Sequence, residues 1–316
     1  MIYEVDSGTV AKLYFPAYRT AYREEKIRAM LKIPLSPELD AEVAWPKDIL
    51  YDRGGFCGFV MRRVFGVPLE QLYSETYRDL PLPRLVTIAK NLCALVGSLH
   101  AAGVVIGDMN PNNFYVLPQV GLVRAIDTDS FHIQDGGKIY RCEVNVPQYL
   151  APMVAAGIPP GETLKTVPLP TYSVESDRYS LAIHVFELLM GGTHPFAMAV
   201  GSSNSGHVPQ LEESMRRYIF PYDNCPYGYK LPVYALRYKT LSERLQFMFT
   251  KTFSRGNVIA PEHWYAALNA FGGEITKVCN RNPAHQFRRG LRKCPYCASA
   301  KRADAFFKKI QKARNK

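Results

Sequence analysis

The feature that most constrains this chain is a series of polar residues at fixed spacing within the segment 99–130. An amphipathic helix ending in Leu-His-x-x-Gly is followed by the apolar triplet Val104–Ile106, and then by Asp108 and Asn113 with four residues between them. A second carboxylate, Asp127, comes nineteen residues after Asp108. Aspartate and asparagine often only cap turns, so no single residue is diagnostic. The fixed order of helix, apolar triplet and three polar side chains is far more restrictive.

This order of motifs resembles that of the eukaryotic-type protein kinases. Asp108 and Asn113 have the spacing of the kinase catalytic loop, and Asp127 stands where the D-F-G aspartate would be. Further segments match kinase landmarks in the same order along the chain. Before Asp108, Val10-Ala11-Lys12 resembles the strand with the nucleotide lysine, and Phe59–Val64 resembles the hinge between the lobes. After Asp127, Val146–Pro152 resembles the end of the activation segment, and Ser176–Leu181 and Gly191–Phe196 resemble parts of the C-lobe.

The resemblance implies a role for each matching residue. Asp108 would be the catalytic base that accepts the proton of the substrate hydroxyl, and Lys12 would contact the phosphates of ATP. Asn113 and Asp127 would hold Mg²⁺ on those phosphates. Met61, at the gatekeeper position, and Arg62, in the hinge, would line the nucleotide site.

A glutamate partner for Lys12 is expected on the predicted helix Tyr18–Leu31. Glu24 shares a helical face with Ile27 and Leu31, which predicts that it points inward. Glu25, about a quarter-turn away, is the second choice.

Two further residues are expected to brace the catalytic loop. Asp177, in the predicted central helix of the C-lobe, would brace the catalytic loop. His100 would brace the loop as a structural residue and would not take part in catalysis.

Several positions depart from the kinase pattern. Ile106 and Gly107 replace the His-Arg of the catalytic loop, so there is no arginine to read a phosphate on the activation segment. Asn110 replaces the lysine that balances the γ-phosphate charge. Asp-Thr-Asp replaces Asp-Phe-Gly, so Asp129 either adds a carboxylate beside the metal site or forms an Asx-turn.

The start of the chain departs as well, because only eleven residues precede Lys12 and they contain no glycine-rich loop. Either that loop lies upstream of this start, or the nucleotide is handled without it. Residues 131–140 alternate around Gly136-Gly137, which predicts a short hairpin in the activation segment.

A second group of candidate ligands lies near the C-terminus. Cys279, His285, Cys294 and Cys297 fall within about twenty residues and end in a Cys-x-x-Cys knuckle. Thiolate and imidazole ligands in a closed tetrahedron suit structural zinc. A redox-active cysteine pair is the alternative interpretation of the knuckle.

Positive charge is concentrated in the same region. Residues 277–316 hold thirteen Lys and Arg against one acid, while the whole chain carries +11. Phe306, Phe307 and Ile310 among these cations are typical of a short amphipathic basic helix. Such a tail could bind nucleic acid, an acidic protein or anionic lipid, or it could be simply solvated. Seven cysteines without a secretory or transmembrane segment favour a reducing cytoplasm.

These patterns together predict an α+β, two-lobed, protein-kinase-like fold. Residues 1–64 would form a β-rich N-lobe without a glycine-rich loop, residues 65–272 a helical C-lobe, and residues 273–316 a small zinc-ribbon-like module with a basic tail. The helices Leu82–Ala102, Leu241–Phe253 and Pro261–Phe271 are expected in the C-lobe.

The chain is also similar to a bacterial serine/threonine kinase-like family with a C-terminal Cys/His module. Its members are often encoded beside a PPM-type phosphatase and a von Willebrand A protein, as in tellurite-resistance-type clusters. The resemblance implies an ATP- and Mg²⁺-dependent kinase acting on a protein substrate against a cognate phosphatase. A pseudokinase scaffold and a small-molecule phosphotransferase remain alternatives, and the sequence does not name the substrate.

Overall fold

The computed structural model describes residues 1–77, 79–159, 161–201 and 207–314, and it has the mixed α+β composition that the sequence predicts. The chain divides into two compact units. Unit 1 consists of Met1–Glu70 and Asn91–Asp177, and unit 2 of Gln71–Lys90 and Arg178–Lys316. The divisions between the units fall after Glu70, within helix α3 (Leu82–Ala101) and in the first turn of helix α5 (Val174–Leu189).

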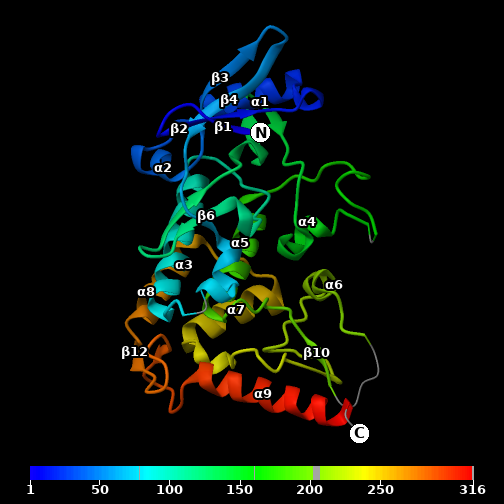
Figure 1. Ribbon diagram of the computed structural model, residues 1–316. Coiled ribbons are helices and arrows are strands. Elements are labelled where there is room, and N and C mark those ends of the chain that lie inside the picture. The colour runs from blue at the N-terminus through cyan, green and yellow to red at the C-terminus, as the bar shows by residue number, and fades with distance from the viewer. Residues whose placement is uncertain (78, 160, 202–206, 315–316) are drawn as a thin grey trace. The chain divides into compact units, whose positions relative to one another are not determined.

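The first part of unit 1 is a four-stranded antiparallel sheet in the order β1-β2-β4-β3 (Figure 1). Its strands are β1 (Ile2–Glu4), β2 (Thr9–Leu13), β3 (Pro46–Asp52) and β4 (Gly55–Arg62). The register places Val10 opposite Met61. Since side chains two apart in a strand share a face, Val10 and Lys12 lie on the same face of β2.

Helix α1 (Ala21–Leu31) packs against β3 and β4 of this sheet (Figure 1). It starts at Thr20, whose hydroxyl accepts a hydrogen bond from the backbone N–H of Arg23. Ile27 and Met30 are fully buried. Helix α2 (Pro37–Glu42) begins in the same way, with Ser36 accepting from the N–H of Leu39.

The second part of unit 1 carries the polar loop segments. A three-stranded antiparallel sheet is formed by β5 (Val67–Pro68), β6 (Phe114–Leu117) and β7 (Leu122–Ala125). Strands β8 (Ile133–Asp135) and β9 (Lys138–Tyr140) form the predicted hairpin, with Gly136 and Gly137 in left-handed conformations at its turn. Helix α4 (Pro152–Ala155) follows. The unit also contains 3₁₀ turns at Pro16–Tyr18, Pro111–Asn113, Thr128–Ser130 and Pro147–Tyr149.

Unit 2 is mainly helical. Its elements, besides its parts of α3 and α5, are α6 (Leu211–Arg216), α7 (Glu243–Arg255), α8 (Pro261–Gly272), α9 (Pro295–Arg314), the strand pairs β10 (Ala199–Val200) with β11 (Tyr229–Lys230) and β12 (Ile275–Val278) with β13 (Gln286–Arg288), and 3₁₀ turns that include Tyr238–Thr240.

The core of unit 2 is an aromatic cluster. Phe186, Phe249 and Phe253 contact one another, with ring centroids 5.0–5.9 Å apart. Trp264 of α8 lies 4.7 Å from Phe249 of α7. Edge-to-face and offset aromatic pairs add to the burial energy, so this cluster fixes how α5, α7 and α8 pack.

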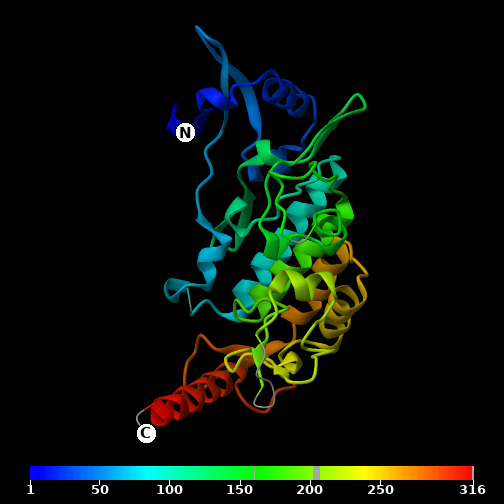
Figure 2. The ribbon, with the colours of Figure 1, turned by 90° about the vertical axis from the view of Figure 1, so that its right-hand side faces the viewer.

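The segment after α8 is the predicted Cys/His module. Strands β12 and β13 pair, and a small core forms from Cys279, Phe287 and Leu291. The expected short basic helix is longer than predicted. Figure 2 shows α9 as one continuous helix, and it starts at Pro295, within the Cys-x-x-Cys knuckle.

Helix α3 is long and apolar enough to span a membrane by length and composition, and it is the one such helix among the residues that the structure describes. Half of the apolar segment is buried inside the protein, and Leu92, Leu95 and Leu99 are fully buried. Core helices of water-soluble proteins have the same properties.

Candidate functional site

Asp108 and Asn113 lie together in unit 1, as their spacing predicts. The loop after Ile106 leads into a 3₁₀ turn at Pro111–Asn113, and the side-chain oxygen of Asn110 caps this turn by accepting from the N–H of Asn112. The turn brings the Asn113 amide to the Asp108 carboxylate, with Nδ2 3.0 Å from Oδ2. Both side chains are buried.

The environment of Asp108 changes its acidity. Burial raises the pKa of this carboxyl to about 6, since the hydrogen bond from Asn113 only partly offsets it and the nearby charge of Asp127 adds to the increase. A carboxylate with a raised pKa is better suited to accept a proton than an exposed one.

Asp177 braces the loop that precedes Asp108, as predicted. Its carboxylate is 1% exposed and accepts hydrogen bonds from the backbone N–H groups of Ile106 at 2.7 Å and Gly107 at 2.9 Å. The third contact is His100 Nε2 at 3.0 Å. One buried carboxylate thus fixes the backbone of the two residues that precede Asp108. His100 contacts the same carboxylate and has the structural role that the sequence indicates.

Gly107 explains why the expected arginine is missing from this loop. Its φ of +77° is unfavourable for residues with a Cβ. A Cβ at this position would also lie 2.9 Å from Cys142 Cβ and 3.3 Å from Tyr172 Cγ. The backbone and the packing therefore both exclude a larger residue.

A second sharp turn carries Asp127 and Asp129. Asp127 has φ +53° and ψ +33°, a left-handed conformation that is uncommon outside glycine and found at functional sites. The 3₁₀ turn Thr128–Ser130 follows it. The Thr128 hydroxyl donates to Ala44 O at 2.7 Å, and the Ser130 hydroxyl donates to Asp127 O at 2.8 Å. These bonds leave Asp127 half exposed and turn Asp129 into the interior.

Lys12 lies between the two carboxylates of this turn. Its Nζ is 2.5 Å from Asp129 Oδ1 and 3.1 Å from Asp127 Oδ1. Tyr14, just after the end of β2, donates its hydroxyl to Asp129 Oδ2 at 2.7 Å. Asp129 therefore neither stands free beside a metal site nor forms a local turn bond. It is the buried counter-ion of Lys12.

The electrostatics of this cluster favour the charged forms. Burial opposes ionisation of Asp129, but the charge and hydrogen bond of Lys12, the hydroxyl of Tyr14 and the charge of Lys26 outweigh it, so the pKa of Asp129 is lowered. Burial likewise opposes the charge of Lys12, and Asp129 and Asp127 together raise its pKa above the usual value.

The expected pair between Glu24 and Lys12 does not form. Glu24 accepts hydrogen bonds from Arg28 at 2.8 Å and from the Tyr51 hydroxyl at 2.6 Å. Glu25, the second choice, pairs with Lys138.

The reason is the rotation of α1. The buried face is formed by Lys26, Ile27, Ala29 and Met30, while Leu31 is 38% exposed. At about 100° per residue, Glu24 and Leu31 point away from that face. The sequence pattern assumed that Leu31 was buried.

Lys26 is a candidate functional residue that sequence reasoning missed. Its side chain lies on the buried face of α1, and burial lowers the pKa of its amine to about 8. It lines a small cavity of about 200 Å³ with Lys12, Asp127 and Asp129. The one signal in the sequence that could have identified it is its position next to Ile27, which is buried.

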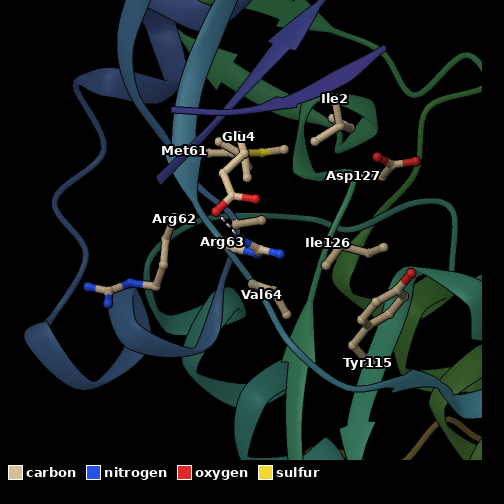
Figure 3. Close-up of a pocket in the computed structure, with 11 residues that line it drawn as sticks. Ile2, Glu4, Met61, Arg62, Arg63, Val64, Tyr115, Ile126 and Asp127 are labelled. Atoms are coloured by element: carbon tan, nitrogen blue, oxygen red, sulfur yellow. Dashed lines mark ion pairs between the residues drawn. The ribbon is translucent and has the colours of Figure 1, made fainter. Parts of the chain in front are cut away.

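A second pocket of about 360 Å³ opens on the other side of Asp127 (Figure 3). Its apolar lining comes from strands of both sheets (Ile2, Val10, Met61 and Tyr115) and from the segments next to them (Ala44, Val64 and Ile126). Asp127 lines both cavities. An apolar slot and a cavity lined by lysines, with one carboxylate lining both, suit a ligand with a flat apolar part and an anionic part.

The two predicted hinge residues differ in their contribution to this pocket. Met61 is buried and its side chain lines the slot. Arg62 lines it too, but Figure 3 shows its side chain pointing away, and its guanidinium lies 3.8 Å from Asp40. Arg63 instead pairs with Glu4 of β1 at 2.7 Å.

In unit 2, the four predicted ligands of the Cys/His module converge. The ligand atoms of Cys279, His285, Cys294 and Cys297 all lie within 4.8 Å of one another. The Cys279 and Cys297 sulfurs are 3.7 Å apart, and His285 Nδ1 lies 3.5 Å from Cys297 Sγ and 3.6 Å from Cys294 Sγ. A tetrahedral zinc with ordinary bond lengths requires about 3.8 Å between sulfurs and about 3.6 Å between sulfur and nitrogen.

The backbone around these sulfurs also suits a metal site, because it stabilises thiolates. The N–H of Arg281 points to Cys279 Sγ at 3.4 Å, and the N–H of Cys297 points to Cys294 Sγ at 3.5 Å. Backbone donors, those of Arg281 and Asn282 first, lower the pKa of the Cys279 thiol to about 7. The group can therefore hold a metal ion that binds thiolate.

Unit 1 thus combines a buried carboxylate, an amide, a half-exposed carboxylate and a lysine beside an apolar slot, and groups of these kinds occur in enzymes that transfer phosphoryl groups. The chain is similar to two curated proteins, each named protein kinase YegI, from Escherichia coli strain K12 and from Escherichia coli O157:H7. Each is 29% identical to it over 311 residues, which is 94% of this chain and 46% of the relative. No family model matches the chain.

The chain spans about half the length of the curated relatives that it matches. The similarity to proteins named protein kinase agrees with the class of site found in unit 1.

The Lys12–Asp129 contact predicts that Asp129 contributes more to the stability of the fold than Glu24 does. Asp129→Asn should lower the free energy of unfolding by about 3 kcal/mol, because it leaves a buried ammonium without its main counter-charge. Glu24→Gln, the matched control, should change it by less than about 1 kcal/mol, because Glu24 pairs at the surface. Denaturant titration of both variants measures this difference, and equal losses would contradict the assigned pairing.

Proposed function

We propose that this chain is a protein kinase of the two-lobed type that transfers the γ-phosphate of ATP to a serine or threonine hydroxyl of a protein substrate. The observation that carries the proposal is the meeting of Lys12, Asp108, Asn113 and Asp127 in unit 1, beside the apolar slot that Met61 lines. The similarity to proteins named protein kinase supports the same activity.

The nucleotide would lie with its base in the apolar slot and its phosphates toward Lys12. Mg²⁺, when bound, would neutralise the charge that develops on the transferred phosphoryl group. Asp127 and the side-chain oxygen of Asn113 fit a hard cation, because they are oxygen donors and Asn113 already points its Nδ2 away, to Asp108. Lys26 adds a second ammonium on the same side.

Asp108 would accept the proton of the substrate hydroxyl. Asn113 orients its carboxylate, and the Asp177 brace fixes the backbone before it. This loop would be ordered without a phosphate on the activation segment, because Gly107 leaves no cation at the position of the kinase arginine to bind one.

A pseudokinase scaffold is the second candidate. The observation that favours it is the engagement of Lys12 by two carboxylates, which leaves its ammonium less available to phosphate. The two candidates differ in whether the chain transfers phosphate with Asp108 as the base.

Asp108→Asn should abolish phosphate transfer and leave nucleotide affinity nearly unchanged, because a base acts in the transition state and not in binding. Transfer of radiolabelled phosphate to the chain or to a generic protein substrate measures the first effect, and calorimetry the second. Glu24→Gln is the control and should retain the rate. Wild-type turnover in the Asp108 variant would show that this loop is not the catalytic one.

We further propose a cytoplasmic protein that works against a PPM-type phosphatase and beside a von Willebrand A partner. The support is the family resemblance of the motifs and the seven cysteines, all of which are unpaired by disulfides.

We also propose that Cys279, His285, Cys294 and Cys297 hold one structural zinc ion. The support is the match between their separations and tetrahedral geometry. The small apolar core of this segment cannot stabilise it alone, whereas structural zinc contributes about 10–16 kcal/mol in small modules.

Elemental analysis of the purified chain should find about one zinc per molecule, because four ligands form one closed site. Cys297→Ser should remove most of the metal, and Cys225→Ser, which changes a half-buried cysteine outside this group, should keep it. Wild-type protein without zinc, with its cysteines reduced, would favour the redox-pair alternative instead.

A further inference from the structure

A basic pocket of about 510 Å³ lies within unit 2. It is formed between the 3₁₀ turn Tyr238–Thr240, the loop after β13 and the start of α9. No carboxylate lines it. The cations that do are Arg237, Lys239, Arg288, Arg292, Lys293 and Arg302.

None of these six cations forms an ion pair within the described part of the chain. Arg302 donates instead to Ala235 O at 2.7 Å and Ala298 O at 3.2 Å, and Arg288 donates to Lys239 O at 3.0 Å. Burial and the neighbouring charge of Arg237 both lower the pKa of Arg302. Like charges are thus held together with only carbonyl contacts, an arrangement that a bound anion would relieve.

A buried hydroxyl in the same wall gives independent evidence for a ligand. Thr240 is 1% exposed and lines the pocket. Its Oγ1 has no hydrogen-bond partner among the described residues. Buried hydroxyls are normally satisfied, so an unpartnered one in a cationic pocket indicates a missing acceptor.

The start of α9 adds to the positive potential. Pro295 and Ala298, in the first turn of this twenty-residue helix, line the pocket, and helix N-termini attract anions. A zinc ion held by three thiolates next to this turn would carry one net negative charge, which the six cations outweigh.

The lining also limits the kind of anion. No aromatic ring and no side-chain amide or carboxylate faces the pocket, so it lacks the groups that stack on a nucleobase or read its edge. Guanidinium groups with a hydroxyl donor match the oxygens of a phosphate monoester, which carries nearly two charges.

We propose that this pocket binds the phosphate of a phosphorylated serine or threonine side chain in a protein segment. Arg237 and Arg292 would pair with the phosphate oxygens, and Thr240 would donate its hydroxyl. The proposal does not require the chain itself to be an active kinase, and its test measures binding alone.

The test uses the full chain and blocked phosphothreonine, N-acetylated and amidated, as the probe in calorimetry. Blocked threonine, inorganic phosphate and a single-stranded oligonucleotide are the comparison probes. Lys12→Gln separates the two sites, because it weakens any binding of the probe at the nucleotide site and should leave binding at this pocket unchanged.

Blocked phosphothreonine should bind more tightly than inorganic phosphate, and blocked threonine should not bind. Arg237→Gln and Thr240→Val should each weaken binding about tenfold, because each removes a charge-assisted hydrogen bond. Thr240→Ser, which restores the hydroxyl, and Lys309→Gln, an exposed cation of α9 outside the pocket, should keep wild-type affinity.

Three outcomes would overturn the proposal. Equal affinity for inorganic phosphate would show a site for the free ion only. Tighter binding of the oligonucleotide, sensitive to the same two variants, would make the pocket a nucleic-acid site. Unchanged affinity in folded Arg237→Gln and Thr240→Val variants would place the probe elsewhere.

Discussion

The ion pair between Lys12 and Asp129 is the contact on which the geometry of unit 1 depends. It joins β2 to the turn after β7, two segments separated by more than a hundred residues in sequence. The turn reaches this position because Asp127 adopts a left-handed conformation and Thr128 is anchored on Ala44 O. The Tyr14 hydroxyl donates to the other oxygen of Asp129, so β2 and the residue just after it hold both oxygens of one carboxylate.

The acid that pairs with Lys12 comes from a different element than the kinase pattern predicts. In the kinase pattern, a helix supplies the acid and the strand supplies the lysine. Here α1 supplies Lys26 and the loop after β7 supplies Asp129. Asp129 therefore takes the place of the helix glutamate as the partner of Lys12, and its charge also acts on Lys26, because no glutamate lies on the buried face of α1.

Much of the site could be predicted because its contacts are local or follow from the order of motifs. Asp108 and Asn113 meet through a short turn, and the β8–β9 hairpin follows from alternation around two glycines. Asp177 is distant in sequence, but its role depends only on backbone N–H groups that any sequence supplies at Ile106 and Gly107.

What could not be predicted depends on packing across segments. The rotation of α1 is decided by Ile27 and Met30 against the sheet, and Leu31 alone gave the wrong face. The contacts at Gly107, from Cys142 and Tyr172, and the cations that surround Thr240 likewise come from segments far apart in the chain.

The most direct test of the central claim, that these side chains form one site for magnesium and nucleotide, is calorimetric titration of the full chain with ATP. The account predicts binding that requires Mg²⁺ and that is lost in Asp127→Ala, because this carboxylate lines both the slot and the lysine cavity. Binding of equal strength with Mg²⁺ chelated, or unchanged by Asp127→Ala, would contradict it.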